Sequence, residues 1–170
     1  FILNKTNCSP WIDGFVIGGK TVTDKTRFAQ AFNEYFVNIG PTLANDIPNP
    51  SANFTSFLKA NFKDSFILFE TDISEVISVT KNLKAKTSSG YDDIPTDIVK
   101  LSITCIAPHL AKIVNKSFAE GSVPNQLKIA KVCPIYKAGE ATKISNYRPI
   151  SVLPSFSKIF EKLVYNRLIN

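Results

Sequence analysis

Two cations flank a polar loop near the C-terminal end of the sequence, and they are the residues best suited to binding phosphate. Lys137 lies at the start of this loop and Arg148 lies just after it. An arginine presents a planar fork of donors to phosphate oxygens, whereas a lysine presents a compact point charge. The pair would therefore suit a triphosphate or a nucleic-acid backbone. Judged by residue type alone, ordinary exposed positions remain the favoured interpretation of both.

Other polar residues of the same stretch would suit contacts with a single-stranded nucleic acid. Lys131, Lys143, Asn146 and Tyr147 supply charge and hydrogen-bonding groups, and the ring of Tyr147 offers a face on which a base could stack. Residue types again favour ordinary exposed strand and loop positions for these four. The surrounding charge fits a polyanion, because the formal net charge is +6 and residues 112–168 are strongly basic. The charged residues of that segment are Lys112, Lys116, Lys128, Lys131, Lys137, Lys143, Arg148, Lys158, Lys162 and Arg167 against Glu120, Glu140 and Glu161.

Two apolar runs and a helix must position these residues. The runs 129–136 and 147–153 are rich in strand-forming residues, and the polar loop between them predicts a hairpin with a long connection. From Ser155 onward, apolar residues recur at helical spacing. The sequence thus predicts an α+β fold that is mostly α-helical, with a short β-hairpin near the C-terminus. Further helices are expected from residue 23 or 24 to a break at Pro41, over 71–83, over 95–101, and from about residue 107 to 118 with Pro108 in the first turn.

The stretch Gly14-Phe-Val-Ile-Gly-Gly-Lys-Thr21 matches the pattern of a phosphate-binding loop. Such a loop needs a buried strand before it and a helix that begins at its lysine, so that backbone amides converge on phosphate. Residues 8–13 make a poor buried strand, and the helical pattern starts only at residue 23 or 24. An exposed turn in a short hairpin is therefore favoured. A nucleotide binder centred on Lys20 is the weaker alternative.

Several motifs occur in the same order as in a known family. They are Ser89-Gly-Tyr-Asp-x-Ile-Pro95, Gly121-x-x-Pro124, Pro134-Ile-x-Lys-x-Gly139, Asn146-Tyr-Arg-Pro-Ile-Ser151, Ser157-Lys-Ile-x-Glu-Lys162 and Asn166-Arg-Leu168. This set resembles the fingers of a reverse transcriptase from a non-LTR, LINE-type retrotransposon of the Jockey kind. Upstream, Ala31-Phe-Asn-x-Tyr-Phe36 resembles the segment that precedes the polymerase in such elements.

The resemblance implies a division of the chain and a role for its cations. Residues 1–69 would be an upstream linker region, and residues 70–170 would be the N-terminal fingers part of a reverse transcriptase, truncated before the palm. Lys137 and Arg148 would grip the triphosphate of the incoming nucleotide, and this overrides the ordinary interpretation for these two residues only. The implied partners are an RNA template with a DNA primer, a deoxynucleoside triphosphate in the full-length enzyme, and the palm in cis.

The resemblance also implies what this stretch lacks. Polymerases hold two Mg²⁺ ions on palm carboxylates, and those motifs are expected beyond Asn170. Mg²⁺ is therefore expected in the full-length parent, with none bound by this fragment, which would not be catalytic alone. Tyr91-Asp-Asp93 lacks the spacing of the polymerase metal motif. A non-catalytic nucleic-acid-binding or interaction module derived from such an element is the main alternative.

Composition disfavours other classes of protein. Cys8, Cys105 and Cys133 show no metal-binding spacing, and their odd number in a chain without a signal peptide predicts reduced, intracellular thiols. The expected location is the nucleus and the cytoplasm. No apolar run approaches the roughly 18 residues of a membrane span, so no membrane partner is expected. The sequence contains no Met and ends within a helical pattern, which predicts an internal fragment. Without a palm, the last helix is expected to expose Phe156, Phe160 and Leu163.

Overall fold

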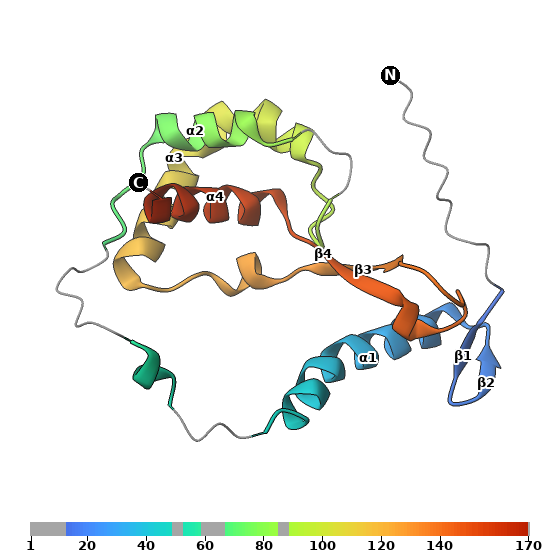
Figure 1. Cartoon of the computed structure of the whole chain (residues 1–170). Coiled ribbons are helices and arrows are strands. Elements are labelled where there is room, and N and C mark those ends of the chain that lie inside the picture. The colour runs from blue at the N-terminus through green and yellow to red at the C-terminus, as the bar shows by residue number, and fades with distance from the viewer. Residues whose placement is uncertain (1–12, 49–52, 59–66, 85–88, 170) are drawn as a thin grey trace. The chain divides into compact units, whose positions relative to one another are not determined.

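The computed structural model describes residues 13–48, 53–58, 67–84 and 89–169, and Figure 1 shows the order of the elements. It confirms an α+β fold that is mostly helical, with a hairpin near the C-terminus. The helices are α1 (Lys25–Asn45), α2 (Ile73–Asn82), α3 (Thr96–Glu120) and α4 (Ser155–Ile169), with short 3-10 turns η1 (Phe54–Phe57), η2 (Asn125–Lys128) and η3 (Ile144–Asn146). The strands are β1 (Phe15–Ile17), β2 (Lys20–Val22), β3 (Lys131–Tyr136) and β4 (Tyr147–Val152).

Contacts divide the chain into two compact units that are each discontinuous in sequence. The first, here called the hairpin unit, comprises residues 1–61 and 133–150, and the second, the helical unit, comprises residues 62–132 and 151–170. Strands β3 and β4 therefore contribute to both units. The boundary expected between residues 69 and 70 stays a prediction. It was drawn from the resemblance to a protein family, whereas these two units are defined by contacts within the structure.

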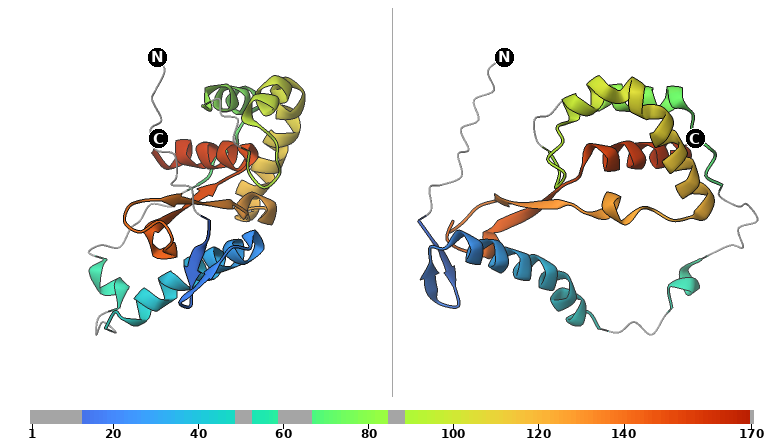
Figure 2. Two further views of the ribbon diagram at one scale, coloured as in Figure 1. Left: turned by 90° about the vertical axis from the view of Figure 1, so that its right-hand side faces the viewer. Right: turned by 180° about the vertical axis from the view of Figure 1, so that it is seen from behind.

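The core of the helical unit lies between α2, α3 and α4, which Figure 2 shows from two further sides. Apolar residues at helical spacing put one face of each helix into this core. Asp72 caps α2, because its side chain accepts a hydrogen bond from the Glu75 amide at 2.7 Å. The buried core residues are Val76, Val79, Val99, Ile103, Ala107, Ala111, Val114, Phe118, Ile159, Phe160 and Leu163.

The predicted break before Pro108 is wrong, because α3 is one continuous helix with this proline inside it. A proline within a helix removes one backbone hydrogen bond and costs roughly 3 kcal/mol. The buried face of α3 runs across that point, with Ile103, Ala107 and Ala111 all in the core. Packing on both sides of the proline therefore outweighs its local cost. Pro41 likewise lies inside α1 rather than ending it.

The exposure expected for the last helix is also wrong. Leu163 is 0% exposed, Phe160 is 7% exposed and Phe156 is half-buried. The rings of Phe118 and Phe160 meet edge to face with their centroids 5.8 Å apart. Within the helical unit, α2 and α3 pack against the buried residues of α4.

The glycine-rich stretch near the N-terminal end forms a tight hairpin. Phe15 pairs with Val22 and Ile17 pairs with Lys20 across β1 and β2. Gly18 and Gly19 make the turn with φ values of 57° and 76°, a region that suits glycine. Lys20 begins a strand rather than a helix, so the amides cannot converge on a phosphate as a phosphate-binding loop requires. The structure therefore contradicts the alternative centred on Lys20.

Two further properties of the described residues concern membranes and metals. None of their helices is both long and apolar enough to cross a membrane. They also contain no group of three or more histidine, cysteine, aspartate or glutamate side chains placed to hold a metal ion.

Candidate nucleic-acid interface

The hairpin of β3 and β4 has a fixed register at its tip. The amide of Lys137 donates to the carbonyl of Asn146 at 2.8 Å, directly beyond the ends of both strands. The next pair inward is Tyr136 and Tyr147, whose ring centroids are 5.6 Å apart. These two rings therefore share one face of the hairpin.

Strand alternation then assigns the two candidate phosphate-binding residues to the other face. Lys137 follows Tyr136 and Arg148 follows Tyr147, and successive side chains of a strand point to opposite faces. Their positions are diagonal neighbours across the hairpin, a relation that brings long side chains within reach of each other. Both are exposed, and neither forms a salt bridge with any other residue that the structure describes.

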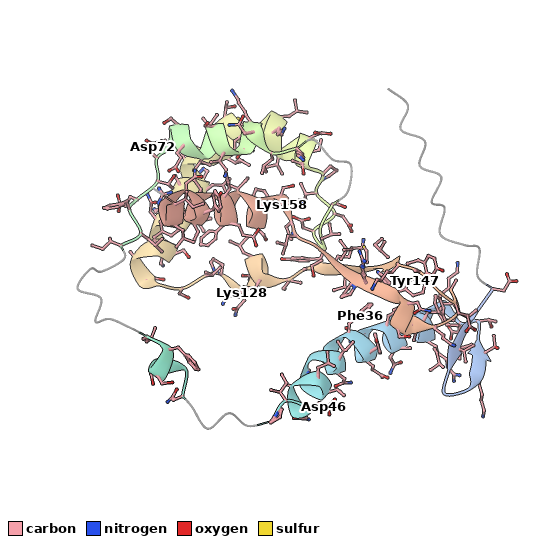
Figure 3. All side chains as sticks on the ribbon, in the orientation of Figure 1. Phe36, Asp46, Asp72, Lys128, Tyr147 and Lys158 are labelled. Carbon is pink, nitrogen blue, oxygen red and sulfur yellow. The ribbon has the colours of Figure 1, made fainter. Side chains whose placement is uncertain are left out.

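The face with the tyrosines is fixed by an aromatic cluster within the hairpin unit. The ring of Tyr147 lies 5.5 Å from that of Phe15 and 5.1 Å from that of Phe32, measured between centroids. Phe15 also meets Phe28 at 4.9 Å and Phe32 at 5.0 Å. Burial, followed by the influence of Tyr136, raises the pKa of the Tyr147 hydroxyl above its ordinary value. Figure 3 shows Tyr147 on the hairpin and Phe36 on α1.

The loop of residues 137–146 is held by its own hydrogen bonds. The side-chain amide of Asn146 donates to the Glu140 carbonyl at 2.8 Å, and the hydroxyl of Tyr147 donates to the Ala141 carbonyl at 2.8 Å. The carboxylate of Glu140 lies 2.7 Å from the Lys143 ammonium. The hydrogen bond from Lys143 and one from Thr142 hold the pKa of Glu140 below its ordinary value. The Val16 amide donates to the Thr142 carbonyl at 3.0 Å, so β1 supports this loop.

The four residues predicted to meet the template have different surroundings. Lys131 belongs to the helical unit, where its ammonium lies 3.9 Å from Asp93 with both side chains largely exposed. Lys143, Asn146 and Tyr147 lie together on or beside the loop, where each is engaged in a contact described above. Their contact with a template stays a prediction.

A second polar network was not anticipated from the sequence. Arg167, near the end of α4, bonds to Glu75 of α2 and to the carbonyls of Phe69 and Glu70. The side chain of Asn115 forms two hydrogen bonds with the backbone of Thr71. Its amide oxygen accepts from the Thr71 nitrogen at 2.7 Å, and its amide nitrogen donates to the Thr71 carbonyl at 2.8 Å. These contacts link residues far apart in sequence, so no local spacing could have revealed them.

Comparison with known proteins gives the chain its relatives. No protein-family model matches it. It is 32% identical over 114 residues to the RNA-directed DNA polymerase from mobile element jockey of Drosophila melanogaster, a match that covers 66% of this chain and 12% of the relative. From the same organism, the probable RNA-directed DNA polymerase from transposon BS is 34% identical over 97 residues, covering 56% of this chain and 11% of the relative. A putative 115 kDa protein of the type-1 retrotransposable element R1DM is 31% identical over 99 residues, covering 57% of this chain and 10% of the relative.

These matches span only 10% to 12% of the length of the three relatives. All three relatives come from mobile genetic elements. Their names confirm the family resemblance that the sequence motifs indicated. The chain is related to the RNA-directed DNA polymerases of Jockey-like non-LTR retrotransposons.

Proposed function

We propose that this chain is the fingers part, with its upstream segment, of an RNA-directed DNA polymerase from a non-LTR retrotransposon. It contributes contacts to the template and to the phosphates of the incoming nucleotide, and it is not catalytic alone. One observation carries this assignment. Lys137 and Arg148 are exposed, and strand alternation assigns them to the face of the hairpin opposite the paired rings of Tyr136 and Tyr147.

The hairpin has the properties that binding of a triphosphate demands. The charge of a triphosphate must be balanced by cations held in place before the reaction, so that little reorganisation is needed during it. Arg148 offers a planar fork and Lys137 offers a point charge. The aromatic cluster and the loop hydrogen bonds hold the backbone that carries both residues. The backbone beneath the two side chains is thus held in place before a ligand binds, while their charged ends stay accessible.

The carboxylates for the metal ions are assigned to the rest of the parent polymerase. When bound there, Mg²⁺ would stabilise the attacking and leaving oxygens of phosphoryl transfer. The described residues offer no cluster of side chains that would fit such an ion, so no step is assigned to a metal in this chain. An intracellular setting, in nucleus and cytoplasm, belongs to the same proposal.

The template contacts divide into direct and supporting ones. Lys131 and Lys143 are exposed and their ion pairs are of the weak surface kind, so a phosphate can replace either carboxylate partner. Asn146 and Tyr147 have their polar groups committed to loop carbonyls. We assign these two residues to shaping the loop.

The test is the binding of the full chain to a labelled, unstructured oligouridylate over a range of salt concentrations. For single strands, each lost phosphate contact makes the slope of log affinity against log salt less steep by about 0.7. Without a nucleotide present, the cations of Lys137 and Arg148 are available to phosphates of the oligouridylate, so Lys137→Ala combined with Arg148→Ala should flatten the slope by about 1.4. The matched control is Lys112→Ala with Lys116→Ala, which removes the same charge from exposed positions of α3. Equal slopes for the two double variants would contradict the proposal.

A non-catalytic binding module shares the same interface and remains the second candidate. The same hairpin substitutions, made in a full-length parent, distinguish a part of an active polymerase from a non-catalytic binding module. If the parent is an active polymerase, the substitutions should raise its KM for the deoxynucleoside triphosphate. A binding module predicts weaker RNA binding in a parent that shows no polymerisation with or without the substitutions.

A further inference from the structure

A groove lined by polar and apolar side chains runs between α2 and α4 in the helical unit, and none of its lining residues belongs to the hairpin site. Its volume is about 510 Å³. The lining side chains used below are Glu75, Ser78, Asn82, Lys84, Lys162 and Asn166. Asn166 and Arg167, near the end of α4, contact Glu75 near the start of α2, so the two helices run in opposite directions along the groove. Figure 3 shows Asp72 and Lys158, near the starts of the two helices, at opposite ends of the pair.

The two walls of the groove carry rows of polar side chains one turn apart. On α2, Ser78 and Asn82 are separated by four residues and therefore share a face. On α4, Lys162 and Asn166 have the same spacing, and Lys158 lies one turn earlier in the same row. Hydroxyl and amide groups donate and accept hydrogen bonds, as contacts to phosphate and sugar require.

Charge in the groove favours an anion. Lys84 and Lys162 are exposed, and neither forms a salt bridge among the described residues. The Lys162 ammonium lies 4.0 Å from the centroid of the Tyr165 ring, which steadies the cation without neutralising it. The carboxylate in the lining, Glu75, is already bound by Arg167, Thr71 and Asn166. Its charge is therefore compensated within the protein, and the groove presents a net positive surface.

We propose that this groove is a second binding site for the sugar-phosphate backbone of a single-stranded nucleic acid. The choice of nucleic acid among polyanions rests on the proposed function, whereas the site itself does not depend on the hairpin. Neutral donors beside two cations suit a backbone that alternates phosphates with sugar oxygens. The rows of side chains rise about 6 Å per four residues, so they form a track along the groove rather than a single point of charge.

The experiment measures binding of an unstructured oligouridylate by the full chain. Lys84→Gln combined with Lys162→Gln should flatten the salt slope by about 1.4, since two contacts to a single strand are lost. The control pair is Lys112→Gln with Lys116→Gln on α3, which should leave the slope close to that of the parent chain. Ser78→Asp, which adds a carboxylate to the groove, should weaken binding at least several-fold. Its control, Thr104→Asp at an exposed position of α3, should not.

The outcomes separate this inference from the proposed function. Groove variants that bind like their controls would overturn the second site, and the hairpin variant would still decide the proposed function. Weakening in the groove variants alone would support the second site and count against the hairpin. Thermal unfolding unchanged from that of the parent chain shows that a variant is folded. If polyglutamate binds as tightly as the oligouridylate and is lost in the same variants, the groove takes acidic protein and the assignment to nucleic acid fails.

Discussion

The guanidinium of Arg167 lies 2.8 Å from a carboxylate oxygen of Glu75, across 92 residues of sequence. The arginine side chain is 8% exposed and that of the glutamate is 29% exposed, so water screens the pair weakly. Arg167 also donates to the carbonyls of Phe69, Glu70 and Leu163 and lies over the Phe118 ring at 5.0 Å from its centroid. One side chain thus ties the end of α4 to the start of α2 and to the segment before it.

Arg167→Ala should lower the free energy of unfolding by about 3 kcal/mol, because it leaves Glu75 without its partner in a poorly solvated position. Arg167→Lys should recover only part of this loss, since lysine lacks the fork that reaches several acceptors at once. Urea unfolding measures both changes. Lys116→Ala removes an exposed pair with Glu120 at 3.7 Å and should change stability by less than about 0.5 kcal/mol. A loss in Arg167→Ala no larger than in this control would show that the network contributes little.

Acid should weaken the same contact. Hydrogen bonds from Arg167, ahead of those from Thr71 and Asn166, hold the pKa of Glu75 below its ordinary 4.5, although burial acts in the opposite direction. The unfolded chain therefore takes up the proton first as the pH falls. The stabilisation is complete well above pH 4.5 and is lost as the pH falls through the lower pKa of the folded state.

Unfolding by urea between pH 7 and pH 3 tests this pH dependence. The parent chain should lose more stability over that range than Glu75→Gln, which carries no proton to titrate at this position. Other carboxylates titrate in both proteins, so the difference between them isolates Glu75. Parallel curves for the two proteins would contradict the assignment of the pKa shift.

Elements with a strong local pattern were predictable from the sequence. The strands of the hairpin and α4 follow from apolar spacing and from the prolines and polar loop around them, and all appear close to their expected bounds. The continuity of α3 was not predictable, because it depends on partners in α2 and α4 that cover its face on both sides of Pro108. Local propensity cannot weigh that gain against the cost of a proline.

The arrangement of the candidate site residues was not predictable from the sequence, and their function stays a prediction. The family resemblance, rather than residue type alone, indicated phosphate binding by Lys137 and Arg148. Their placement on one face depends on the register across a ten-residue loop, which spacing alone does not fix. For Tyr147, an aromatic ring in a basic loop suits stacking on a base and packing in a core equally well. The deciding partners, Phe15 and Phe32, lie more than a hundred residues away in the sequence. The Arg167 network has the same long-range origin.

The aromatic cluster should control the stability of the hairpin unit. Phe32 is 7% exposed and contacts both Phe15 and Tyr147, so Phe32→Ala should cost about 3 kcal/mol. Tyr147→Phe keeps the ring but loses the hydrogen bond to the Ala141 carbonyl and should cost about 1 kcal/mol. Phe57→Ala is the control, because that side chain is 73% exposed. Hydrogen exchange at the amides of Lys137 and Val16 reports on this unit directly, and exchange unchanged in Phe32→Ala would show that the cluster does not hold the loop.

Two glycines should respond in opposite directions to the same substitution. A Cβ at Gly90 would lie 2.5 Å from the Pro154 nitrogen and 2.8 Å from its Cα, so Gly90→Ala must move backbone and should cost about 2 kcal/mol. A Cβ at Gly40, inside α1, would meet nothing within 4 Å. Gly40→Ala should therefore stabilise the chain by up to about 1 kcal/mol, through the higher helix propensity of alanine. Thermal unfolding of the two variants beside the parent chain gives both signs in one experiment. A destabilised Gly40→Ala would mean that α1 is not helical at that point, and an unchanged Gly90→Ala would mean that the segment before α3 does not approach Pro154 so closely.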